Sequence, residues 1–232
     1  MAARFSRWKN SKGRETLFAF PYEGAETIII VPPVALLDRP SLSAHILQGC
    51  AGGREKVSVF YACFAFAAWT GQLVNDGFAY LSPRYLLSER IFAAQAYGVP
   101  LLGNNAEAVY HRMIADHFLG EGGFPLSFEE LIFLSQEIST WVDDLARFLV
   151  ARKPKVVGCS TTFEQTAASV AILKAVKRLA PQIVTIIGGA NCAGEMAEGV
   201  ASLDQGIDYV FSGESDTALP AFLKQIAVGL PG

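Results

Sequence analysis

The chain contains few cysteines, and no two of them lie close enough in sequence to form a compact metal-binding motif. Among 232 residues the only cysteines are Cys50, Cys63, Cys159 and Cys192, and no CxxC or CxxxCxxC spacing occurs. This excludes a zinc site or an iron–sulfur cluster built within one loop. Four cysteines are also too few for a disulfide framework, so we expect a reducing, cytoplasmic location.

The sequence is also short of charge and of long apolar runs. Charged residues make up 18%, hydrophobic residues 51%, and the formal net charge is -3. This composition excludes a disordered chain and argues against a nucleic-acid partner, which requires a strongly basic face. No run reaches the roughly 18 apolar residues of a membrane span, and the longest, residues 57–69, is interrupted by Ser58. We therefore expect no membrane partner.

The first 24 residues are basic and lack a following apolar segment, so they do not resemble a secretory signal. We expect residues 1–24 to form a flexible N-terminal arm and residues 25–232 to form one domain.

Five short runs rich in valine, isoleucine and aromatic residues predict β-strands. Each is apolar at consecutive positions, which is typical of strands covered on both faces of a parallel sheet. The runs are Thr27–Val31, Val57–Tyr61, 156–159, 183–187 and Tyr209–Phe211.

Helical patterns fill most of the intervals between these runs. The expected helices cover residues 40–48, 83–97, 106–119, 127–152, 162–179, 195–201 and 218–228. The alternation predicts an α/β fold, a flavodoxin-like doubly wound five-stranded parallel sheet with strand order 2-1-3-4-5. A helical insertion, at about residues 63–126, is expected between strands 2 and 3.

Ligands of open α/β sheets bind outside the carboxyl ends of the strands, and here these ends carry mostly small or polar residues. No GxGxxG or GxxxxGK[ST] motif is present, so a phosphate loop is not expected. Glycine and alanine after strand 4, and small polar residues after strands 3 and 5, favour a flat, wide ligand. Two structural alternatives stay open: the glycine pair can form only a tight turn, and the hydroxyls after strand 3 can act only as helix caps.

The segment from VVGCSTTFEQ to YVFSGESDTALP, with IIIVPPVALLDRPSLSAHILQ and SERIFAAQAYG before it, resembles the cobalamin-binding N-terminal domain of cobalamin-dependent radical SAM enzymes. Within these enzymes it is most similar to the RiPP maturation radical SAM protein 1 group. The resemblance covers about residues 27–227.

This resemblance implies a domain that binds cobalamin above the sheet and works with a radical SAM barrel. The barrel carries a [4Fe-4S] cluster and S-adenosylmethionine, and many members methylate unactivated carbon with methylcobalamin as the donor. For this chain the resemblance implies a methyltransferase that acts on a ribosomal peptide (RiPP maturation). By position, the resemblance implies that the cofactor contacts Val34, Ala35, Leu36, Leu37, Ser160, Thr161, Thr162, Gln165, Gly188, Gly189, Ala190, Asn191, Gly213 and Glu214.

The chain departs from the family in two places. It ends at Gly232, where the barrel would begin, so we expect a cut piece, a truncated product or a split subunit. Gly213-Glu214-Ser215-Asp216 replaces the frequent GEGE. Separately, classical methyltransferase and mutase cobalamin domains use a DxHxxG motif whose histidine binds cobalt. Asp116-His117 lacks one spacer residue of that motif, so no histidine ligand is expected.

No residue of the chain is expected to be catalytic or to bind a metal ion directly, because the implied chemistry belongs to the assembled enzyme. Its partners would be a radical SAM barrel, in the same chain or separate, and a peptide substrate. Glu89 and Arg90 are expected to form a solvent-exposed pair, with contact to the cofactor as the alternative. Two alternative functions remain at this stage: a flavodoxin-like module for another flat cofactor such as a flavin, and a cofactor-free interaction subunit.

Overall fold

A computed structural model describes residue 18 and residues 26–54, 56–81, 83–117 and 123–229. Its centre is a five-stranded parallel sheet with the order β2-β1-β3-β4-β5, which confirms the predicted topology. The strands are β1 (Thr27–Val31), β2 (Val57–Tyr61), β3 (Val156–Ser160), β4 (Val184–Gly188) and β5 (Tyr209–Phe211). Every strand lies within one residue of its predicted bounds.

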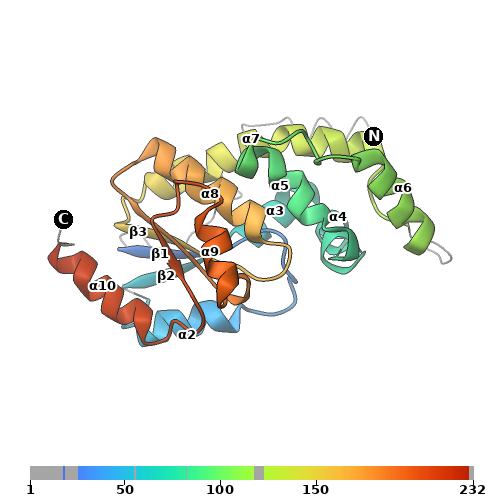
Figure 1. The fold of residues 1–232 in the computed structure, drawn as a ribbon. Helices are drawn as coiled ribbons and strands as arrows, with labels where there is room; N and C mark the ends of the chain where they lie inside the picture. The colour runs from blue at the N-terminus through green and yellow to red at the C-terminus, as the bar shows by residue number, and fades with distance from the viewer. Residues whose placement is uncertain (1–17, 19–25, 55, 82, 118–122, 230–232) are drawn as a thin grey trace.

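Helices cover both faces of the sheet (Figure 1). They are α2 (Leu42–Cys50), α3 (Ala62–Thr70), α4 (Gln72–Asp76), α5 (Leu87–Tyr97), α6 (Ala106–His117), α7 (Phe128–Val150), α8 (Thr166–Leu179), α9 (Glu195–Ala201) and α10 (Ala218–Val228). Helices α7 and α8 lie over one face, and α2 and α10 lie over the other. Because β1 and β3 are thus covered on both sides, all their residues are buried.

The face under α7 and α8 contains the main core. Ile28 and Ile30 of β1 point into it, and Trp141 of α7 is fully buried there. The rings of Trp69 and Phe66 lie 6.0 Å and 5.5 Å from the Trp141 ring. The predicted capping box at Ser127 begins α7: the Ser127 hydroxyl accepts from the Glu130 amide, and the Glu130 carboxylate accepts from the Ser127 amide.

The insertion between β2 and β3 begins with α3 directly after β2 and continues through α4, a π-helix (Gly77–Leu81), a 3-10 turn (Pro83–Tyr85), α5 and α6. Helices α4 to α6 extend away from the sheet (Figure 1). The single helix expected over residues 83–97 is wrong, because Leu86 adopts a left-handed conformation, with φ 53°, and separates the 3-10 turn from α5.

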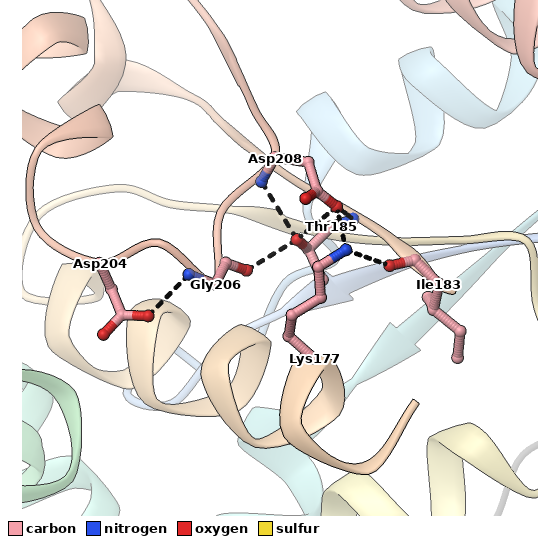
Figure 2. A network of polar contacts seen from close by, with 6 residues as sticks. All are labelled: Lys177, Ile183, Thr185, Asp204, Gly206 and Asp208. Carbon is pink, nitrogen blue, oxygen red and sulfur yellow. Dashed lines mark hydrogen bonds and ion pairs between the residues drawn. The ribbon is translucent and has the colours of Figure 1, made fainter. Parts of the chain in front are cut away.

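A polar network fixes the loop that leads into β5 (Figure 2). The Asp208 carboxylate accepts from the Lys177 ammonium at 2.6 Å and from the Thr185 amide at 2.8 Å. The Thr185 hydroxyl donates to the Gly206 carbonyl at 2.7 Å, and Lys174 pairs with Asp204 at 2.8 Å. The short edge strand is thereby tied to β4 and α8.

The predicted flexible arm, residues 1–24, lies outside the described residues except for Phe18. Phe18 is buried, and its ring lies 5.3 Å from that of Phe148 and 6.0 Å from that of Trp141. Within the described ranges, no helix has the length and apolar character needed to cross a membrane.

Candidate functional site

The sheet face under α2 and α10 is hollow near the carboxyl ends of β3 and β4. Side chains alternate along a strand, so Gly158 and Ser160 of β3 point to this face, as do Ile186 and Gly188 of β4. Three of these four positions therefore carry a hydrogen atom or a small hydroxymethyl group where bulky side chains would fill the core. A cavity of about 530 Å³ occupies this space.

Helix α2 forms part of the cavity roof and is only lightly attached to the sheet. Ala44 and Gln48 are its buried residues, and the Gln48 amide donates to the Val57 carbonyl at 2.8 Å. The Ser43 and Ser160 hydroxyls lie 3.2 Å apart, so a hydrogen bond joins the helix to the end of β3. On the other side, Leu219 of α10 completes the roof.

The mouth of the cavity depends on a close approach between the loops that follow β3 and β4. The Thr161 amide donates to the Gly188 carbonyl at 2.7 Å. At Gly189, with φ 116°, a Cβ atom would lie 2.1 Å from the Thr161 carbonyl oxygen, so only glycine fits. Gly189 is thus required by the backbone, and the glycine pair also leaves the mouth open.

Gln165 connects the loops after β1 and β3. Its side-chain oxygen accepts from the Thr162 amide at 2.9 Å, and its nitrogen donates to the carbonyls of Pro32 and Val34 at 3.1 Å and 3.0 Å. The helix expected from Thr162 begins only at Thr166, because Glu164 is left-handed, with φ 61°. The Thr162–Gln165 pair therefore closes a turn before the helix.

The first turn of α8 is held by side chains from two other elements. The Glu89 carboxylate of α5 accepts from the amides of Thr166 and Ala167 at 2.8 Å and 2.7 Å. Burial raises the pKa of Glu89, and the two amides partly oppose this shift. The Asn191 amide donates to the Thr166 hydroxyl at 2.9 Å and to the Thr162 carbonyl.

The solvent-exposed pair expected between Glu89 and Arg90 is wrong. Glu89 is half-buried at the start of α8, and the Arg90 guanidinium donates to the carbonyls of Leu102 and Asn104 at 2.9 Å and 3.2 Å. The two neighbouring side chains therefore form hydrogen bonds with different parts of the chain.

The structure brings part of the predicted site together around the cavity. The predicted residues that line it are Ser160, Gly188, Gly189, Ala190, Gly213 and Glu214. The remaining predicted residues are outside the lining: Val34, Ala35, Leu36, Leu37, Thr161, Thr162, Gln165 and Asn191. Thr161 and Gln165 are buried, and Gln165 is occupied by internal hydrogen bonds. Contact between a cofactor and the residues of either group stays a prediction.

The residues that line the interior of the cavity were not predicted from the sequence. They include Ile29, Ser43, Leu47, Gly158, Ile186, Phe211 and Leu219. Strand alternation gave a usable signal, since Gly158 and Ser160 are two residues apart and must share a face. The roof residues of α2 and α10 had no such signal, because their position depends on tertiary packing.

Cys159 lies between Gly158 and Ser160, but its thiol points to the opposite face of the sheet, where it lies 4.0 Å from the Ser169 carbonyl oxygen of α8. Burial raises the pKa of Cys159 to about 12 and that of Cys192, in the loop after β4, to about 11. In the part of the chain that the structure describes, no group of three or more His, Cys, Asp or Glu side chains could hold a metal ion.

Comparison with known proteins gives one family. The sequence-family model described as "B12 binding domain" matches residues 103–223, just over half of the chain. The match includes β3, β4, β5 and the cavity mouth between them. Neither the curated proteins nor the solved structures contain a significant match to the chain.

Proposed function

The chain belongs to the family of B12-binding domains, and from this premise we propose that it holds cobalamin for a radical SAM enzyme, a methyltransferase that modifies a ribosomally made peptide. Membership supports cobalamin binding itself. The radical SAM partner, the methyl transfer and the peptide substrate are supported by the sequence resemblance over residues 27–227.

The hollow sheet face is the observation that carries the proposal, because it fits the shape of cobalamin. Cobalamin has a broad corrin ring and a nucleotide arm that ends in an aromatic base. The cavity between Gly158, Gly188 and the roof of α2 can take the arm, and the open mouth at Gly189 and Gly213 leaves room for the ring. A fold filled by bulky side chains at these positions would not fit.

When bound, cobalamin supplies a cobalt centre that carries and transfers a methyl group. The residues of this chain bind it, orient it and exclude water. Ser160 and Ser43 offer hydroxyls at the mouth, and Gly189 lets the ligand approach the backbone. Gln165 holds the loop after β1, which we propose faces the corrin ring, by bonding to the carbonyls of Pro32 and Val34.

We further propose that the chain provides no histidine to cobalt. His45 Nε2 lies 2.9 Å from the Tyr61 hydroxyl, and its Nδ1 lies 3.3 Å from the Gln48 side-chain oxygen. His111 pairs with Glu107 at 3.7 Å on α6, and His117 is the last residue of that helix. We expect the Co(II) form of cobinamide, which has no lower base of its own, to show an EPR spectrum without nitrogen splitting when it is bound to the chain. Such splitting would contradict this point alone.

Titration of the purified chain with hydroxocobalamin tests cobalamin binding. We expect one corrinoid per chain to remain after gel filtration, measured by absorbance, and no retention of FMN in a parallel sample. Retention of FMN without corrinoid would instead favour the flavodoxin-like alternative.

The radical SAM partnership has a separate test. We expect a CxxxCxxC-containing barrel either in the reading frame after the codon for Gly232 or in an adjacent gene whose product co-purifies with this chain. If neither exists, the partnership and the methyl transfer are wrong while cobalamin binding stands.

A further inference from the structure

The inner end of the cavity is enclosed by apolar side chains. Ile29 and Ile186 are the register partners of Gly158 on the neighbouring strands. Their side chains close over that glycine, since a Cβ atom at Gly158 would lie 2.6 Å from Ile186 Cγ1 and 3.0 Å from Ile29 Cδ1. Leu47 of α2 and Leu219 of α10 line the opposite wall. The backbone amides and carbonyls of these strands are engaged in the parallel sheet.

The polar side chains of the cavity lie toward its mouth. Ser160 is two residues beyond Gly158, which is about 6–7 Å further along the strand. The hydroxyl of Ser43 meets it from α2 at 3.2 Å. Glu214 and Asp216 follow β5 at the same edge of the sheet. The cavity is therefore polar where a ligand enters and apolar where it ends.

We propose that this cavity selects corrinoids by their lower base and prefers a benzimidazole to a purine. This inference rests on the proposed binding of cobalamin. The outer ring of dimethylbenzimidazole is hydrocarbon with two methyl groups, which suits walls made by Ile29, Leu47 and Ile186. Adenine has nearly the same bicyclic size but carries an exocyclic amine and ring nitrogens at that end. These groups would lose water without gaining partners, which weakens binding by about 10- to 100-fold.

Three corrinoids test the proposal on the unaltered chain: cobalamin, the cobamide with adenine as its lower base, and cobinamide, which lacks the nucleotide. We expect cobalamin to bind most tightly and the adenine cobamide about 10- to 100-fold more weakly, by calorimetric or absorbance titration. Cobinamide should also bind more weakly than cobalamin. Equal affinity for cobalamin and the adenine cobamide, within about twofold, would overturn the proposed selectivity and leave cobalamin binding intact. Failure of all three to bind would instead overturn the proposed function.

Two variants test whether the apolar wall of the cavity determines the preference for a benzimidazole base. Leu47→Asn places a donor and an acceptor in the apolar wall, and we expect it to narrow the difference between the two cobamides at least threefold. Leu42→Asn is the matched control, because Leu42 lies on the same helix, is 74% exposed and does not line the cavity. Circular dichroism and thermal melting establish that both variants fold. A folded Leu47→Asn protein that keeps the full difference would place the base elsewhere and overturn the proposal. If that variant does not fold, the comparison of the three corrinoids decides.

Discussion

The two faces of the sheet differ in how densely the side chains on them pack. Under α7 and α8, large side chains such as Trp141 are fully buried, and so is most of α8. Under α2 and α10, the strands present Gly158, Ser160 and Gly188, and a cavity remains. Close packing supplies stability roughly in proportion to the apolar area buried, so the filled face should dominate folding. The hollow face is free to serve a ligand because the other face carries the stability.

The largest expected effect comes from emptying the filled face. Trp141→Ala removes a fully buried ring that contacts Trp69, Phe66 and Phe92. The folded state loses the free energy gained by burying this ring, and the cavity left behind destabilises it further. We expect the free energy of unfolding to fall by about 3–5 kcal/mol, measured by urea denaturation. A loss below about 1 kcal/mol would show that the two faces do not differ as described.

Filling the hollow face should affect binding more than stability. Gly188→Leu directs a large side chain into the cavity beside Phe211, and we expect cobalamin affinity to fall at least 30-fold, about 2 kcal/mol. Gly199→Leu is the control, since Gly199 lies in α9 with open space around it and away from the cavity. Titration of both variants gives the comparison. Similar affinities would mean that the cavity is not where the cofactor binds.

The contrast between the faces also explains which features were predictable. The strands and their order followed from local runs such as Thr27–Val31, because burial on both faces leaves a continuous apolar signature. Gly188 and Gly189 were recognisable because small residues at strand ends have local meaning. The start of α8 was missed, because a left-handed Glu164 and the distant Glu89 determine it. The roof of α2 was missed because contacts between residues remote in sequence, such as Ser43 and Ser160, have no local pattern.

The attachment of β5 to the filled face gives a smaller effect. Asp208→Asn removes the charge that Lys177 and the Thr185 amide share, and Lys177 is left partly buried without its counter-charge. We expect a loss of about 1–2 kcal/mol in the free energy of unfolding. Asp38→Asn is the control, because its pair with Arg39 is exposed on both sides, with 58% and 65% of the two side chains exposed, and should contribute far less to the free energy of unfolding. Equal losses would show that the network in Figure 2 contributes no more than an exposed pair.

The smallest expected effect is a pH dependence at the start of α8, where the filled face meets the loops of the site. Burial raises the folded-state pKa of Glu89 above its ordinary value of about 4.5. As pH rises through and above that value, the unfolded chain loses this proton before the folded chain does. The folded state then binds more protons, so the contribution of Glu89 to stability is greatest at low pH and declines as pH rises.

Glu89→Gln removes this titration and keeps an oxygen that can accept from the amides of Thr166 and Ala167. We expect the stability of the native protein relative to this variant to decline between about pH 4 and the raised pKa. The slope cannot exceed about 1.4 kcal/mol per pH unit, the limit for one proton. Urea denaturation of both proteins at a series of pH values measures the difference. A difference that grows with pH would mean that the two backbone amides outweigh burial and that the carboxylate is stabilised in its charged form at the helix start.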